Sequence, residues 1–505
     1  MLVCLIIIQS FGMQHSYQSG KVRLHVNRED KFMISRRSFL RGVAGGAVSM
    51  VLAPTVFSET KSLNRPNIIL CMADDMGWGD PGFNGNPIIK TPNLDAMSKA
   101  GIRFTRFYSG APVCSPTRGS CLTGRHPYRY GIFGANVGHM PKEEITLAEA
   151  LKTQDYTTGH FGKWHLGTLL PDYSGKGPNR KPQENYMTPG MSGFDEWFST
   201  EYAVATWDPY DPAQFHGKKK DYDVRALYWH NGINVTEALK VDDSRIIMDR
   251  AIPFISNAAE SKKPFLAVIW FHAPHIPVVA GPQYRAMYSQ YSADEQHYYG
   301  CITALDEQVG RLRKQLRTLG IADNTILWFC SDNGPEGKDG KSGRSRGSAG
   351  PYRGRKRSLF EGGVRVPGLC EWPARIKAGR LTDIPCSTLD YFPTVMDVLG
   401  FKMKGRPEPV DGVSMLPLIG NGMTERPLPI SFESKNQVSL TGNRYKIYSN
   451  DNGKTYMLFD LLDDPGENHD LASEKSEILQ EMKKKLEIWR VSCKNSLAGK
   501  DYTKL

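Results

Sequence analysis

The sequence predicts an α/β protein in which helices sandwich a large, mostly parallel sheet, followed by a smaller C-terminal α+β subdomain. Three features predict this fold class. Short apolar runs rich in Ile, Leu, Val and aromatic residues are typical of strands buried on both faces. Longer segments with helical spacing alternate with these runs, as in α/β folds. Beyond about residue 395 the sequence pattern changes to short strand-like stretches separated by turns.

Four apolar runs are the clearest strand candidates, and each ends in polar residues. In open α/β sheets, sites gather outside the carboxyl ends of the strands, so these polar groups are expected to converge. The runs are "PNIILCMADD" (66–75), "YTTGHFGKWH" (156–165), "PFLAVIWFHAPH" (264–275) and "NTILWFCSDNG" (324–334). The polar groups that follow them are Asp74, Asp75, Lys163, His165, His272, His275, Asp332 and Asn333.

Two segments carry helix signals. A helix is expected over residues 91–101, where Thr91 and Pro92 are a start signal and Gly101 is a stop, and a long one over residues 292–320. Irregular insertions at about 168–230 and 334–357, rich in Gly, Pro, Tyr, Lys and Arg, are expected as surface loops around the mouth of a site.

The C-terminal part reads as a subdomain of its own. Residues 430–472 are expected as short antiparallel strands joined by "DNGK" and "DDPGEN" turns, and residues 473–494 as an amphipathic helix. The predicted organisation is a leader over 1–60, a main domain over 61–395 and a C-terminal subdomain over 396–505.

Length, charge and cysteine content bound the class of protein. With 505 residues, 40% of them hydrophobic, the chain can bury a large core. Its net charge of +11 favours anionic partners, and leaves nucleic acids, acidic polysaccharides and small anionic esters open. The nine cysteines form no CxxC pair, so neither a zinc ribbon nor a disulfide framework is indicated.

The leader resembles a twin-arginine export signal. "ISRRSFLRGVAGGAVSMVLAP" places Arg36 and Arg37 before a modest apolar stretch, although a basic patch before a buried helix is the alternative. Met33 is a plausible true start. The preceding "MLVCLIII" is shorter than the ~20 residues that a membrane span needs. We therefore expect the export machinery to deliver the protein to the periplasm or the extracellular space, with no stable membrane span.

The segment "APVCSPTRGSCLTGRHP" (111–127) contains a C-x-P-x-R motif formed by Cys114, Pro116 and Arg118. Free cysteine usually behaves as a small buried hydrophobe, so a cysteine in so polar a loop suggests a chemical role. With "NIILCMADDMGWGD", "GKWHLG", "APHIP", "SDNG" and "KRSLFEGGVRVP" in the same order, the chain resembles a type I sulfatase of the alkaline phosphatase superfamily. The resemblance implies a mixed, mostly parallel, alkaline phosphatase-like sheet and hydrolysis of sulfate monoesters.

In that family the motif cysteine is oxidised by a separate maturation enzyme. The resemblance therefore implies that Cys114 is converted to formylglycine (3-oxoalanine), whose hydrate is the nucleophile, and that Cys121 lies outside the recognised element. One hydroxyl of such a hydrate attacks sulfur, and the other later expels sulfate by re-forming the aldehyde. A plain thiol cannot do this.

Four side chains offer hard oxygen ligands, which suit Ca²⁺ or Mg²⁺ rather than zinc. They are Asp74, Asp75, Asp332 and Asn333. The resemblance implies that they hold one Ca²⁺, which also touches the group made from Cys114, and that Asp332 can serve as a base. The alternative is that "DD" and "SDNG" are ordinary strand-end turns.

A sulfate ester needs cations for its non-bridging oxygens and a proton donor for its leaving oxygen. Arg118 and Lys163 are the natural cations, and Lys356 matches the late lysine of the family, although Arg355 and Arg357 leave that assignment uncertain by one residue. An extended "GKWHLG" segment would place Lys163 and His165 on one side, with the tryptophan between them in the core. By resemblance His165 is the base that drives release of sulfate.

The family pattern of His, any residue, then Pro selects His275 over His272. By resemblance His275, with Lys356, protonates the leaving alcohol, whereas His272 is read as a strand-end residue satisfied by local hydrogen bonds. The loop histidines are expected to be structural or rim groups: His126, His139, His160 and His216. The Glu361-Gly362-Gly363 turn is expected to shape the backbone, because glycine allows close approach or positive φ.

The run "KSGRSRGSAGPYRGRKR" (341–357) admits a nucleic-acid reading, but an exported sulfatase accounts for it better as a loop that attracts sulfated polyanions. A merely solvated loop is an equal alternative. We therefore expect a sulfatase acting on a sulfated carbohydrate, with no nucleic-acid partner. An arylsulfatase with an unknown physiological substrate fits equally well. The rivals are a phosphonate or phosphate ester hydrolase of the same superfamily and a non-catalytic binder of sulfated glycans whose Cys114 is never converted.

Overall fold

The computed structural model describes residues 65–176, 180–214, 223–237 and 239–502. The predicted leader, including Arg36, Arg37 and Met33, lies outside the described residues, and so does His216. The boundary at residue 395 stays a prediction. No helix within the described ranges is both long and apolar enough to cross a bilayer.

The main sheet has the strand order β10-β2-β9-β8-β1-β7-β3-β4-β5-β6, with β11 paired to β2. The four predicted strands are confirmed and form its parallel centre, because β1 pairs with β7 and β8, and β3 pairs with β7. Antiparallel pairs of β9 with β2 and β8, and of β5 with β4 and β6, make the sheet mixed. The strands are β1 (Asn67–Ala73), β2 (Ile102–Tyr108), β3 (Thr157–Lys163), β4 (Glu196–Thr200), β5 (Trp229–His230), β6 (Ile233–Asn234), β7 (Phe265–Trp270), β8 (Thr325–Ser331), β9 (Arg365–Glu371), β10 (Arg380–Thr382) and β11 (Cys386–Ser387).

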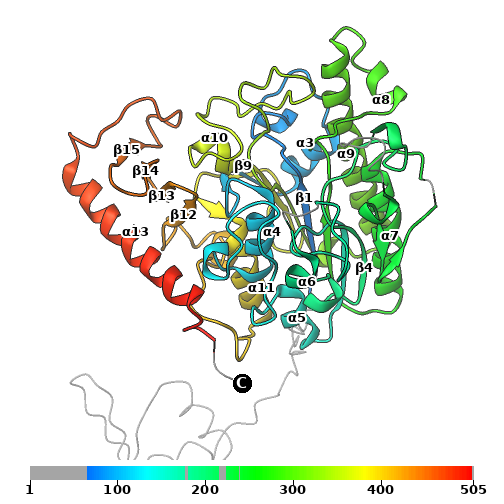
Figure 1. The fold of residues 1–505 in the computed structure, drawn as a ribbon, viewed down its shortest axis with the longest axis horizontal. Coiled ribbons are helices and arrows are strands. Elements are labelled where there is room, and N and C mark those ends of the chain that lie inside the picture. Colours follow the sequence, from blue (N-terminus) through cyan, green and yellow to red (C-terminus); the bar gives the residue numbers. More distant parts are fainter. Residues whose placement is uncertain (1–64, 177–179, 215–222, 238, 503–505) are drawn as a thin grey trace, which may run out of the picture. The chain divides into compact units, whose positions relative to one another are not determined.

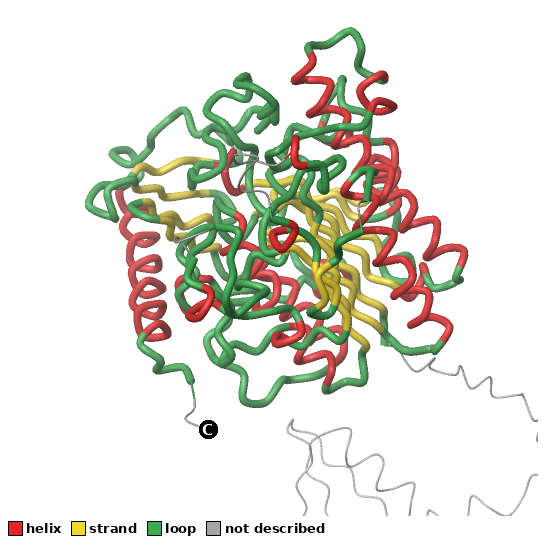
Figure 2. Tube along the Cα trace, turned by 45° about the vertical axis from the view of Figure 1, so that its right-hand side comes forward, coloured by secondary structure: helices red, strands yellow, loops and turns green. Residues whose placement is uncertain are grey.

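Helices cover both faces of this sheet (Figures 1 and 2). Alternate residues of β1 show why: Ile68 and Leu70 belong to one apolar cluster, and Ile69 and Cys71 to a second one on the opposite face. Helices α4, α5 and α11 contribute to the first cluster, and α3, α7, α8 and α9 to the second. The longer helices are α3 (Pro92–Ala100), α4 (Cys114–Thr123), α5 (Leu147–Lys152), α7 (Asp243–Glu260), α8 (Pro282–Ala286), α9 (Ala293–Thr318) and α11 (Tyr391–Leu399). The short ones are α6 (Pro182–Asn185), α10 (Glu361–Val364) and α12 (Leu416–Ile419).

A second, antiparallel sheet lies beside the main one, with α13 (Ser476–Leu497) along its outer side (Figure 1). Its strands are β12 (Ile430–Ser434), β13 (Gln437–Thr441), β14 (Tyr445–Ser449) and β15 (Met457–Asp460). The "DNGK" turn joins β14 and β15 as predicted, whereas "DDPGEN" follows β15 and leads towards α13.

A buried ion cluster joins the two sheets. Lys446 on β14 lies 2.9 Å from Glu361 and 2.8 Å from Glu467, and Arg365 lies 3.3 Å from Glu361. The expectation that the Glu361 turn only shapes backbone is therefore incomplete. The close approach is confirmed at Gly362, where a Cβ would lie 2.3 Å from the carbonyl oxygen of Gly354.

Candidate active site

Three buried carboxylates meet where β1 and β8 end. Asp74 and Asp75 directly follow β1, and Asp332 directly follows its parallel neighbour β8. Asp75 adopts φ 66°, and its N–H donates to Asp332 Oδ1 at 3.1 Å. Aspartate tolerates this left-handed conformation better than most residues. Carboxylates this close repel one another, so the group needs cations to hold it together.

Arg118 and Lys163 supply two of these cations. Arg118, from α4, donates to Asp332 Oδ2 at 2.7 Å and lies 3.5 Å from Asp74 Oδ2. Lys163, at the end of β3, places its Nζ 2.5 Å from Asp74 Oδ2. Because Arg118 also donates to the backbone carbonyl of Lys163 at 3.1 Å, the two cations are fixed relative to each other.

Lys356 supplies the third cation. Its Nζ lies 2.7 Å from Asp75 and 3.3 Å from Glu336. Arg355 turns away and donates to carbonyl oxygens of its own loop, and Arg357 pairs with Glu336. The structure therefore brings Lys356, of these three neighbours, to the carboxylates.

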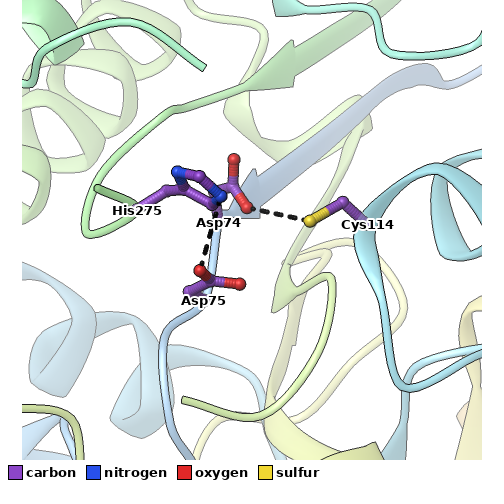
Figure 3. Close-up of side chains that lie close together, drawn as sticks. All are labelled: Asp74, Asp75, Cys114 and His275. Atoms are coloured by element: carbon purple, nitrogen blue, oxygen red, sulfur yellow. Dashed lines mark hydrogen bonds and ion pairs between the residues drawn. The ribbon is translucent and has the colours of Figure 1, made fainter. Parts of the chain in front are cut away.

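Cys114 is the first residue of α4, and its side chain is buried. The prediction of a polar loop around it is wrong, since the whole segment from Cys114 to Thr123 is a buried helix. Its Sγ lies 3.5 Å from Asp74 Oδ1 (Figure 3). Burial, reinforced by the nearby charge of Asp332, raises the pKa of the thiol, which keeps it protonated and poorly nucleophilic.

His275 and Asn333 complete the group around Asp75. His275 Nε2 lies 3.7 Å from Asp75 Oδ2 (Figure 3), and Asn333 Nδ2 donates to Asp75 Oδ1 at 2.7 Å. The ligand atoms of Asp74, Asp75, Cys114 and His275 all lie within 4.8 Å of one another. The predicted convergence of the strand ends is thus present in the structure.

Neighbouring charges move the pKa values of these acids in opposite directions. Burial acts to raise the pKa of Asp74, but Lys163, His275 and Arg118 bring it well below its usual value. Burial and the charge of Asp74 raise the pKa of Asp332 to about 7. The charged form of Asp74 is thus favoured, whereas burial and the neighbouring charge favour the protonated form of Asp332.

His165 lies in the site, but it does not continue strand β3, so the alternation of side chains along a strand does not explain its position. β3 ends at Lys163, Trp164 is buried as predicted, and His165 has φ 57°, so the expectation of an extended segment through His165 is wrong. His165 Nε2 lies 2.7 Å from Asn136 Oδ1, and its buried Nδ1 has no hydrogen-bond partner among the described residues. Burial, followed by the charge of Lys163, lowers the pKa of this imidazole well below its usual value.

His272 lies outside the group, as its sequence context predicts. Its Nδ1 lies 2.8 Å from Asp243 Oδ2 and its Nε2 lies 2.8 Å from Thr200 Oγ1. His160 is buried within β3 against Ser199, and His126 packs its ring edge-on against Trp489 of α13. These contacts are structural ones.

Comparison with known proteins decides the family. Residues 66–401 match the family model described as Sulfatase, and residues 352–492 match that of the N-sulphoglucosamine sulphohydrolase C-terminal region. The chain belongs to the sulfatase family, in the alkaline phosphatase superfamily. This sulfatase is therefore a sulfuric ester hydrolase.

Several known proteins are similar to this sulfatase over most of its length. It is 30% identical to N-acetylgalactosamine-6-sulfatase of Canis lupus familiaris, over 80% of this chain and 75% of that protein. It is 30% identical to arylsulfatase A of Bos taurus, over 82% of this chain and 85% of that protein. A solved structure described as Ps i-CgsB in complex with k-i-k-neocarrahexaose matches with TM-score 0.71 and 30% identity, over 84% of this chain and 92% of that one.

The residues of this sulfatase fit a hard divalent cation. Asp74, Asp75 and Asp332 bring three carboxylates together, and the buried Oδ1 of Asn333 accepts no hydrogen bond from any residue that the structure describes. A buried acceptor without a partner is costly unless something binds it. Carboxylate and amide oxygens are hard donors, and hard donors favour Ca²⁺ or Mg²⁺ over zinc.

Above these carboxylates lies a small cavity of about 130 Å³. It is lined by predicted site residues and by residues that the motifs did not single out. The predicted ones are Cys114, Lys163, His165, His275 and Lys356; the others include Asn136, Lys176, Tyr202 and Arg357. Lys176 stands 4.1 Å from the centre of the Tyr202 ring. Both belong to the insertion predicted at the mouth of the site. Its content of basic and aromatic residues was the feature of the sequence that could have pointed to them.

Proposed function

We propose that this sulfatase hydrolyses sulfate monoesters of a sulfated carbohydrate, using a formylglycine made from Cys114 and one bound Ca²⁺. The observation that carries the proposal is the position of Cys114, 3.5 Å from Asp74, in a cavity walled by Lys163 and Lys356. A tetrahedral anion with three non-bridging oxygens needs this density of positive charge. The names of the relatives, which include an N-acetylgalactosamine-6-sulfatase, support a sugar sulfate as the substrate.

Asp74, Asp75, Asp332 and Asn333 are the proposed metal ligands. When present, the formylglycine hydrate supplies a hydroxyl nucleophile that a buried thiol cannot, and Ca²⁺ supplies positive charge beside it. Lys163 and Lys356 lie within 2.7 Å of Asp74 and Asp75 and neutralise part of the acidic charge. Because both lysines also line the cavity beside Cys114, they are the proposed cations for the sulfate oxygens.

Lys356 and His275 are the proposed donors to the bridging oxygen. They line the cavity from the Asp75 side, and the Nδ1 of His275 lies 2.6 Å from the carbonyl oxygen of Ile276. A carbonyl only accepts, so Nδ1 carries a hydrogen, and donation from Nε2 to the ester oxygen requires the doubly protonated ring. His165, with its free Nδ1, is proposed to accept a proton during release of sulfate.

The experiment is co-expression with a formylglycine-generating maturation enzyme, followed by mass spectrometry of the peptide that contains Cys114. We expect an aldehyde at this position, turnover of nitrophenyl sulfate, and far slower turnover of the matching phosphate diester. Cys121→Ala is the matched control, because Cys121 lies on the same helix and outside the motif. Full sulfatase activity with an intact thiol would overturn the mechanism, and preference for the phosphate diester would overturn the substrate class.

We also propose export by the twin-arginine route, on the basis of Arg36 and Arg37 in the leader. The paired variant Arg36→Lys, Arg37→Lys should keep the protein in the cytoplasm, because the pathway reads both arginines. The folding state of the retained protein is the control, measured by its nitrophenyl sulfate activity. Unchanged export of the variant would contradict this route.

A further inference from the structure

We propose a second anion-binding site in this sulfatase, which takes a sulfate or carboxylate group on a sugar unit next to the one that is desulfated. The site is a cavity of about 1030 Å³ lined by residues 336–341, 346–350, 352 and 354–358 and by Gln437, and we call it the basic cavity. The inference rests on the proposed carbohydrate substrate. It assigns the basic cavity to the sugar units that neighbour the one carrying the hydrolysed sulfate.

The lining of the basic cavity is strongly cationic. Two acids, Glu336 and Asp339, face six basic side chains. The six are Lys338, Lys341, Arg346, Arg355, Lys356 and Arg357. A concave surface of one charge sign raises the local concentration of oppositely charged ligands, so an anionic substrate is the ligand that this lining favours.

The two acids offset only part of this charge, since Glu336 lies within ion-pair distance of Arg357 and Lys356, two of the six. Glu336 forms a two-pronged pair with Arg357, at 2.6 and 2.9 Å. Asp339 accepts from the backbone N–H of Lys341 at 2.9 Å, as part of a turn. Within the described ranges, Lys338 and Lys341 have no carboxylate within ion-pair distance, and both are exposed. Their ammonium groups are therefore available to a ligand.

The basic cavity adjoins the small cavity beside Cys114, because Lys356 and Arg357 line both. The small cavity has about 130 Å³, below the roughly 300–1,000 Å³ of typical ligand sites. It has room for a sulfate group and little more. A saccharide whose sulfate lies beside Cys114 must extend outwards, and the basic cavity is the adjoining space.

Arg357 is held at the junction by its backbone. Its φ is 77°, its N–H donates to the carbonyl oxygen of Pro112 at 2.9 Å, and its carbonyl oxygen accepts from Gln437 at 2.8 Å. A non-glycine residue in this region is uncommon, and it persists where its surroundings hold it. Pro112 lies two residues before Cys114, so the connection ties the basic loop to the reactive end of α4.

The test is direct binding, by calorimetry, of three probes to the maturated protein and to the double variant Lys338→Ala, Lys341→Ala. The probes are a sulfated dextran oligomer, an oligogalacturonate and neutral dextran. We expect the wild type to bind both anionic oligomers, and the double variant to bind them about tenfold more weakly, since charge-assisted contacts of this kind carry about that factor. Loss confined to one oligomer identifies sulfate or carboxylate as the preferred group. Lys377→Ala is the matched control, because Lys377 is exposed and lies outside both cavities.

Inhibition by inorganic sulfate separates the two cavities. It should be the same in the wild type and in the double variant, because a single sulfate ion reports the site beside Cys114. Equal binding of the oligomers by all variants, or binding of neutral dextran as tight as that of the anions, would overturn the inference. Oligomer binding without turnover of nitrophenyl sulfate would instead contradict the proposed function and leave the basic cavity intact.

Discussion

Arg118 and Asp332 form an ion pair of 2.7 Å in which neither side chain reaches solvent. The pair joins α4, which begins at Cys114, to the end of β8. It therefore fixes the reactive end of the helix against the acidic group, in addition to balancing charge. Arg118 also contacts the backbone carbonyl of Lys163, so its guanidinium links α4 to the ends of both β8 and β3.

Removing this guanidinium should destabilise the protein and abolish activity. We expect Arg118→Met to lower the free energy of unfolding by about 3–5 kcal/mol, because it leaves Asp332 buried without its partner. Urea denaturation measures this, with the exposed Arg375→Met as control. The double variant Arg118→Met, Asp332→Leu should recover part of the stability and none of the activity. A single variant as stable as the wild type would contradict the assigned role of the pair.

Chelation of divalent cations should destabilise the maturated protein. The acids that follow β1 and β8 repel one another, and a cation that binds only the folded state stabilises it by about 2.7 kcal/mol at a free concentration of 100 times Kd. We expect Ca²⁺ to raise the thermal midpoint and a chelator to lower it. Asn333→Ala should shrink this difference, whereas Asn257→Ala, on the exposed side of α7, should leave it unchanged. An unchanged midpoint in chelator would contradict a bound metal.

The strand ends were predictable because a parallel sheet imposes its own geometry. Apolar runs buried on both faces identify β1, β3, β7 and β8 one by one, and their parallel pairing then brings their carboxyl ends to one edge. Asp74 and Asp332 could therefore be paired across 258 positions of sequence without knowledge of any contact.

Residues outside this geometry could not be placed in advance. The left-handed φ of His165 and the start of α4 at Cys114 depend on local hydrogen bonds and packing that periodicity does not encode. Lys176 and Tyr202 reach the cavity from the segment 168–230, which the sequence predicts as an irregular surface loop but which contributes α6 and β4, the latter a strand of the main sheet. The ion pairs of Glu361 with Lys446 depend on how the second sheet docks, which a single sequence does not specify.

The two histidines of "FHAPHIP" should respond differently to substitution. His275 lines the cavity over Cys114, so His275→Gln should lower kcat/KM for nitrophenyl sulfate by about 100-fold or more, the usual loss for a group in acid–base catalysis. His272 contacts Asp243 and Thr200, so His272→Gln should cost about 1–3 kcal/mol of stability through unpaired buried groups. Its effect on kcat/KM of the folded protein should stay small. Equal losses of activity in both variants, with equal stability, would contradict this distinction.

His126 should make the protein sensitive to acid. The ring is buried between the main domain and α13, and burial lowers its pKa to about 3, with Asp411 opposing and Arg129 adding to the effect. The unfolded chain binds the proton at a pKa of about 6.5. The contribution to stability is therefore complete above that value and is lost as the pH falls from about 6.5 towards 3, by up to ~1.4 kcal/mol per pH unit.

Urea denaturation between about pH 4.5 and pH 7.5 measures this slope. We expect His126→Gln to be less stable than the wild type at neutral pH and to have a shallower dependence on pH, because the glutamine has no proton to take up on unfolding. His469→Gln is the matched control, since His469 is exposed in the C-terminal subdomain and should leave the slope unchanged. If the wild type and His126→Gln lose stability in parallel as the pH falls, the acid sensitivity arises from other groups.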